Sequence, residues 1–155
     1  MKWKSQDVAI YHQSQEYVDT VVVPLIPMSF GTDMKTAAMM SQYARLIVEE
    51  MERQLHGRLF LVPEFVYGPF ESEESLHLRL QAWRKHVKEA GFTHLFYVTS
   101  DVRWKKDEHL LEDPLLWVPA IPIETMSAEY QEEIVKEQAK QLFQVIVNEW
   151  SKAPL

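Results

Sequence analysis

The feature that most constrains the fold is the apolar run VVVPLI at residues 21–26, which leads through PMSFGTD into a helical pattern. A strand with one face in water alternates apolar and polar residues, whereas a strand covered on both faces is apolar on successive residues. The segment from Val18 to Ile26 therefore predicts a strand inside a parallel sheet that carries helices on both faces.

Similar apolar strands alternate with amphipathic helices along the rest of the chain. The patterns predict strands at 18–26, 59–62, 94–99 and 115–119, and helices at about 5–17, 33–56, 73–90 and 127–152. This alternation predicts an α/β fold with a mostly parallel four-stranded sheet, in a single domain that spans residues 1–155. The third connection has room for only a turn or two of helix, so the direction of the fourth strand stays open.

Residues at the expected helix ends support these boundaries. Asp33 and Ser127 stand where N-caps belong, and Gly57 and Gly91 stand where a left-handed residue ends a helix. In the helix at 73–90, the spacing predicts that four apolar residues face the core: Leu76, Leu80, Trp83 and Val87.

The final helix has a wider apolar surface than one contact with a sheet requires. Its apolar residues are Ile134, Val135, Ala139, Leu142, Phe143, Val145, Ile146, Val147 and Trp150. The excess either packs against the N-terminal helix or forms a twofold homodimer interface. We place the intramolecular contact slightly ahead, because small domains often pack their terminal helices together.

Composition excludes several classes of function. The chain has no cysteine, which excludes disulfides, thiolate metal sites and thiol catalysis. A formal net charge of −7 disfavours nucleic acid as a partner, because phosphate binding requires a basic surface. The sequence contains neither a signal-peptide pattern nor a run of about 18 apolar residues, so it predicts a cytoplasmic protein without a membrane span.

Ligands of open α/β sheets bind outside the carboxyl ends of the strands. Ten polar residues at the ends of the predicted strands are the candidates for a ligand site: Ser29, Thr32, Asp33, Glu64, Tyr67, Thr99, Ser100, Asp101, Arg103 and Glu124. If Asp33, Glu64 and Asp101 converged, their carboxylates could bind a divalent metal. Helix capping and turn formation explain Asp33 and Asp101 without a bound metal, and we favour this structural explanation for both. Glu64 has no capping role.

Other catalytic patterns are missing. The glycines at 31, 57, 68 and 91 are too far apart for a dinucleotide fingerprint or a phosphate-binding loop. His77 and His86 are nine residues apart and not one helical turn, so they do not form a helical metal pair. No serine lies in a glycine-flanked nucleophile elbow. The sequence accordingly predicts no cofactor.

Two resemblances bear on function. From MKWKSQDV through VVVPLIP to LLWVPAIPIE, the chain resembles the YpiF-like family of small bacterial proteins, whose function is unknown. The strand, GTD turn and helix at 21–40 are similar to the start of creatininase-like amidohydrolases, which implies Asp33 as a metal ligand. The Glu-x-His-Gly-x-His segment of that family has no counterpart between Pro27 and Gly31.

These observations lead to two functional hypotheses. The first is a non-enzymatic α/β domain that binds a protein or a small ligand. The alternative is a metal-assisted hydrolase of the creatininase type, or a degenerate form of one, with Asp33, Glu64 and Asp101 as oxygen ligands.

Overall fold

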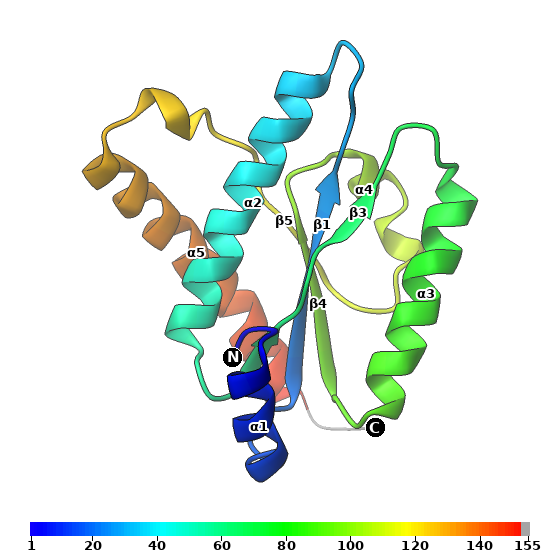
Figure 1. Cartoon of the computed structure of the whole chain (residues 1–155), viewed down its shortest axis with the longest axis vertical. Coiled ribbons are helices and arrows are strands. Elements are labelled where there is room, and N and C mark those ends of the chain that lie inside the picture. The colour runs from blue at the N-terminus through cyan, green and yellow to red at the C-terminus, as the bar shows by residue number, and fades with distance from the viewer. Residues whose placement is uncertain (153–155) are drawn as a thin grey trace.

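The computed structural model describes residues 1–152 and contains one parallel sheet with helices on both faces (Figure 1). Its strands are β1 (Thr20–Pro27), β2 (Leu59–Leu61), β3 (Phe65–Tyr67), β4 (His94–Thr99) and β5 (Leu115–Trp117). The order across the sheet is β2-β1-β4-β5, with β3 also paired to β1, and every pairing is parallel. The predicted α/β class is confirmed, and the fourth predicted strand runs parallel to its neighbour.

Five α-helices connect and cover the strands: α1 (Ser5–Gln13), α2 (Met34–Gln54), α3 (Glu73–Glu89), α4 (Arg103–Lys106) and α5 (Ala128–Ser151). Two short 3-10 helices, η1 (Glu108–Leu110) and η2 (Ile123–Thr125), flank β5. Helices α2 and α5 pack against one face of the sheet, and α1, α3 and α4 pack against the other. This doubly wound arrangement is the one that parallel strands with right-handed crossovers produce.

The predicted strand at 59–62 is confirmed as β2. It is followed by a strand that was not predicted, β3, and the two pair with successive parts of β1. Val22 of β1 accepts a hydrogen bond from Val62, so the backbone of Pro24, two residues on, faces the same neighbour. Pro24 has no N–H to donate there, and Pro63 lies in the gap between β2 and β3. The missing donor of Pro24, which faces the gap between β2 and β3, explains why the strand is interrupted.

Helix α5 does not pack against α1, which corrects one sequence-based expectation. Its buried residues Val135, Leu142 and Ile146 belong to the same apolar cluster as Ile47 and Met51 of α2. Residues of α1 instead join the cluster on the opposite face, where Tyr11 stacks on Phe92. The sheet separates the two helices, so the apolar surface of α5 is buried mainly by α2 and the sheet.

The prediction that Trp83 faces the core is wrong, since its side chain is 60% exposed. Leu76 and Leu80 are buried as expected. The next position on that stripe is Arg84, whose guanidinium forms ion pairs with Glu112 and Asp113. Because each helical residue is rotated by about 100° from the one before it, Trp83 points away from the core.

The expected helix-ending glycines are confirmed, and one of them gives a stability prediction. Gly57 and Gly91 have φ angles of +97° and +99°. Replacing Gly91 by Ala forces a Cβ into this left-handed conformation, and we expect the free energy of unfolding to fall by about 1–2 kcal/mol. Urea denaturation measures the loss.

Gly31→Ala is the matched control for this substitution. The backbone of Gly31 does not have a positive φ, and the nearest atom to an added Cβ lies at 3.5 Å. We expect a change within about 0.5 kcal/mol or a small gain in stability. An equal loss in both variants would contradict the conformational explanation.

Within residues 1–152, no helix combines the length and the apolar character needed to cross a bilayer.

Candidate functional site

The carboxyl ends of β3, β1 and β4 lie side by side at one edge of the sheet (Figure 1). The chain crosses from β1 to β2 on one side, and β4 lies on the other side of β1. In open α/β sheets, the crevice at such a reversal of strand order is where ligands bind. Three loops form this edge: residues 28–33 after β1, 68–72 after β3 and 100–102 after β4.

The loops after β3 and β4 are joined by a hydrogen bond between two candidate residues. The Tyr67 hydroxyl donates to Oδ2 of Asp101 at 2.6 Å, and Oδ1 of Asp101 accepts the backbone N–H of Arg103 at 3.0 Å. Burial, and secondarily the Asp101 carboxylate, raise the pKa of Tyr67 well above its usual range. Tyr67 therefore stays protonated at neutral pH and acts as a donor.

Arg103 holds the loop after β3 in place. Its Nε atom donates to Glu73 at 2.6 Å, and its terminal nitrogens donate to the carbonyl groups of Gly68 and Glu71. The guanidinium carbon also lies 5.8 Å from the centre of the Tyr67 ring. Because these partners occupy the guanidinium, Arg103 has a structural role at this edge.

The loop after β1 contains Thr32 and Asp33, both exposed. Asp33 stands at the N-cap position of α2 as expected, but its side chain makes no capping hydrogen bond. It accepts a hydrogen bond from the Ser29 hydroxyl instead, and that hydroxyl accepts the N–H of Gly31. The backbone N–H of Met28 donates to the Tyr67 carbonyl at 2.9 Å, which ties this loop to the end of β3.

Two candidates lie away from this group. Glu64 precedes β3 and forms an ion pair with Arg45 of α2 at 2.8 Å. Glu124 is exposed in η2, which lies across α2 from the loop after β3 in Figure 1. In the described part of the chain, residues 1–152, no group of three or more His, Asp or Glu side chains could hold a metal ion. Asp33, Glu64 and Asp101 thus have separate partners and form no common ligand set.

Ser100 is the one candidate whose side chain is buried without a partner. Its side chain is 5% exposed, and among residues 1–152 its hydroxyl has no hydrogen-bond partner. A buried hydroxyl without a partner lowers stability. Ser100 directly precedes Asp101 and is the buried first residue of the loop after β4.

Three large apolar side chains at this edge are strongly exposed. Phe30, Phe70 and Val102 are 80%, 88% and 66% exposed, and each comes from a different one of the three loops. Met28 and Met34 are half exposed beside them. We call these five residues the carboxyl-edge surface. Of the other exposed aromatic residues, Trp83 and Tyr130 lie on α3 and α5, and Trp3 and Tyr17 flank α1.

Sequence reasoning missed these five residues because it looked for polar groups. A signal existed in the segments SFGTD, GPFES and SDVRW, each of which places a large apolar residue among turn-forming residues after a strand. Such a residue lies outside the periodic core pattern, and its repetition after three strands could have singled out Phe30, Phe70 and Val102, although not their exposure.

Comparison with known proteins agrees with the broader of the two resemblances. A family model described as "Protein of unknown function (DUF2487)" matches residues 9–150. The chain belongs to this DUF2487 family. It is also 29% identical over 151 residues to the uncharacterized protein YpiF of Bacillus subtilis (strain 168), covering 97% of this chain and 99% of YpiF. No solved structure matched the chain.

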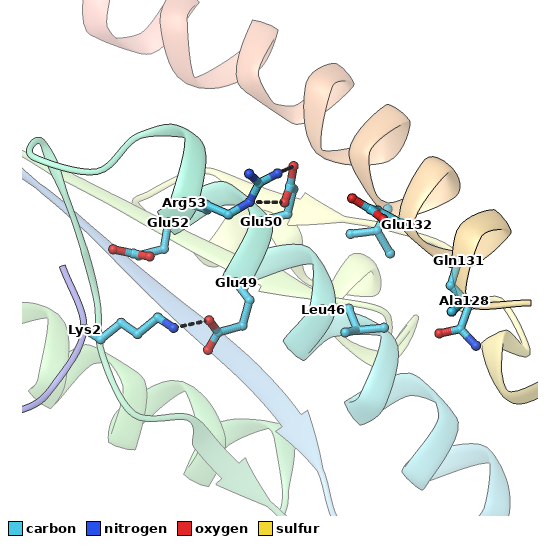
Figure 2. A pocket seen from close by; sticks show the side chains of 10 residues that line it. Lys2, Leu46, Glu49, Glu50, Glu52, Arg53, Ala128, Gln131 and Glu132 are labelled. Carbon is cyan, nitrogen blue, oxygen red and sulfur yellow. Dashed lines mark hydrogen bonds and ion pairs between the residues drawn. The ribbon is translucent and has the colours of Figure 1, made fainter.

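This DUF2487 chain also has a cleft of about 380 Å³ between α2 and α5 (Figure 2). Leu46, Ala128 and Val135 form its apolar part. Its charged side chains mostly pair with one another, as Lys2 does with Glu49 at 2.6 Å and Arg53 with Glu50 at 2.7 Å. None of the candidates from the sequence lines this cleft. Because its charged side chains mostly pair with one another, the cleft does not indicate a particular ligand.

The Arg103 contacts give a second stability prediction for this DUF2487 protein. Arg103→Ala removes hydrogen bonds to Glu73 and to two loop carbonyls, and we expect the free energy of unfolding to fall by about 1–3 kcal/mol. Urea denaturation measures this loss, and hydrogen exchange should report faster opening at residues 68–72.

Arg45→Ala is the control for Arg103→Ala. The Arg45 side chain is 52% exposed in its pair with Glu64, and we expect a loss below about 1 kcal/mol. If both arginine variants lose equal stability, Arg103 does not hold the loop in the way described.

Proposed function

We propose that the protein is a non-enzymatic binding domain that recognises a partner protein through the carboxyl-edge surface. The observation that supports this function is the exposure of Phe30 and Phe70, at 80% and 88%, on adjacent loops. Large apolar side chains that gather at one place on a surface are characteristic of interaction sites. Singly exposed apolar residues are common in proteins and would carry no such meaning.

The loops that carry these residues are held in place before any partner binds. Hydrogen bonds from Met28 to Tyr67, from Tyr67 to Asp101 and from Arg103 to Gly68 connect all three loops. A surface that is already ordered loses less conformational entropy on association than a flexible one. The arrangement therefore favours aromatic anchors that insert into pockets of a partner.

The polar residues of the edge support binding over catalysis. The Tyr67 hydroxyl, the Asp101 carboxylate and the Arg103 guanidinium are all engaged in internal contacts. A general base or nucleophile has to reach a substrate, and these groups have partners within the protein instead. Their role in the proposal is to fix the loops.

Site-specific photocrosslinking in living cells tests this function. Benzoylphenylalanine is placed at position 30 or 70, and, as a control, at position 83 on α3, where the native side chain is 60% exposed. We expect a discrete adduct from positions 30 and 70 only. Excess wild-type protein should compete the adduct away, whereas a Phe30→Ser/Phe70→Ser protein should not. Equal adducts from position 83, or competition by the double variant, would contradict the proposal.

A homodimer through α5 stays a separate prediction, as does the cytoplasmic location. The apolar residues of α5 that remain 40% or more exposed include Val145 and Val147. If they form a twofold interface, light scattering at tens of micromolar gives twice the mass of the 18.3 kDa chain, and Val147→Lys restores the single mass. A single-chain mass for the wild type would exclude this dimer at that concentration.

A further inference from the structure

Resting on the proposed function, we infer that the partner segment at the carboxyl-edge surface is amphipathic, with bulky apolar side chains and basic residues beside them. The apolar side chains would contact Phe30 and Phe70, and the basic residues would face the carboxylates that border them. This inference identifies the chemistry of the partner, which the exposure of the phenylalanines does not provide.

The border of the surface contains carboxylates that no cation neutralises. Asp33 is exposed between Phe30 and Met34, and Glu74 is exposed in the first turn of α3, four residues after Phe70. Within residues 1–152, neither takes part in an ion pair. Asp101 accepts only uncharged donors, from Tyr67 and the Arg103 backbone.

The neighbouring charges do not offset these carboxylates. Glu71 and Glu73 are paired with Arg79 and Arg103, so those four side chains carry no net charge. In α4, Lys105 and Lys106 are followed directly by Asp107 and Glu108. Lys35 is the remaining exposed cation next to the loop after β1. The border is therefore acidic, as is the whole chain with its formal net charge of −7.

This charge distribution determines which apolar segments bind. An acidic segment would place its carboxylates beside Asp33 and Glu74, and like charges at an interface cost free energy. A basic segment gains attraction at the border and approaches faster at low salt. Apolar contacts supply most of the affinity, and the charged border selects among apolar partners.

Three synthetic peptides test the inference by fluorescence anisotropy with the full chain. They share one helical face of Leu and Trp and differ only on the opposite face, which carries Arg, Gln or Glu. We expect the Arg peptide to bind at least about tenfold more tightly than the Glu peptide at 50 mM salt, and the difference to shrink at about 500 mM as charges are screened.

Two pairs of variants assign the binding to this surface. Asp33→Asn/Glu74→Gln should remove most of the preference for Arg over Glu, whereas Glu133→Gln/Glu137→Gln, which removes two exposed carboxylates of α5, should retain it. Phe30→Ser/Phe70→Ser should weaken binding of the Arg peptide by about tenfold or more, and Trp83→Ser should not.

The outcomes separate the inference from the proposed function. Equal affinity for the three peptides, no binding of the Arg peptide, or equal effects of the two carboxylate pairs would overturn the inference of a basic partner. If Phe30→Ser/Phe70→Ser still abolishes crosslinking in cells, the carboxyl-edge surface remains the binding site and only the partner's charge is wrong. If Phe30→Ser/Phe70→Ser changes neither peptide binding nor crosslinking in cells, both the inference and the proposed function are wrong.

Discussion

Replacing Phe96 by Ala is expected to lower the free energy of unfolding by about 3–5 kcal/mol. Phe96 lies in β4, which pairs with strands on both sides, and its side chain is 1% exposed. It belongs to the apolar cluster that joins the sheet to α2 and α5. The substitution leaves a cavity that packed neighbours fill only in part. Urea denaturation at neutral pH measures the change.

Phe70→Ala is the matched control, because it removes the same atoms from a side chain that is 88% exposed. We expect a change within about 0.5 kcal/mol. The comparison also bears on function, since a phenylalanine that contributes nothing to stability is available for binding. A loss above about 2 kcal/mol for Phe70→Ala would show that the ring supports the fold and would weaken the proposed binding role.

The second large effect is expected for Glu52→Gln, which should lower the free energy of unfolding at pH 7 by about 2–4 kcal/mol. Glu52 is 6% exposed and accepts a hydrogen bond from the Met1 amino group at 2.7 Å. His56 lies 2.8 Å from the same carboxylate oxygen. The substitution leaves the buried amino group facing a neutral amide. Glu49→Gln, on an exposed pair with Lys2, should cost less than about 1 kcal/mol.

The effect of Glu52→Gln should depend on pH in a defined direction. Burial alone raises the pKa of Glu52, but contacts with the amino group and His56 outweigh burial and hold the pKa below the ordinary 4.5. A lowered folded-state pKa stabilises the protein above the unfolded value, and this contribution disappears as pH falls through the folded-state pKa. The difference in stability between the two proteins should therefore shrink as the pH falls below 4.5 and disappear below the folded-state pKa of Glu52. A difference that stays constant to pH 3 would contradict the ionic explanation.

Much of the fold followed from local patterns. The strand at 94–99 and the role of Gly91 were both predicted and confirmed, because apolar runs and left-handed glycines reflect local chemistry. The strand β3 was missed, since the break between β2 and β3 depends on Pro24 in the neighbouring strand β1. The position of α5 was wrong in the same way, because the pattern shows how wide an apolar face is and not which element covers it.

Less of the candidate site than of the fold could be predicted from the sequence. Strand ends correctly directed attention to Tyr67 and Asp101, which lie within hydrogen-bond distance. The sequence could not show that their polar groups would bond to each other. Nor could it show the exposure of Phe30 and Phe70, because a loop phenylalanine is as readily folded inward as left in solvent. Only the three-dimensional arrangement distinguishes these cases.

Pro24, which lies opposite the gap between β2 and β3, has a consequence for the behaviour of the chain during its synthesis. The strand β1 emerges early in synthesis, yet the Thr99 hydroxyl that bonds to its Leu25 carbonyl lies 74 residues further along. Until β4 has been synthesised, the apolar segment VVVPLIP has no native partner on that side. Short apolar β-branched segments without proline are prone to stack into fibrils. Pro24 disfavours such stacking at little cost, because its missing donor faces the gap between β2 and β3 in the folded protein.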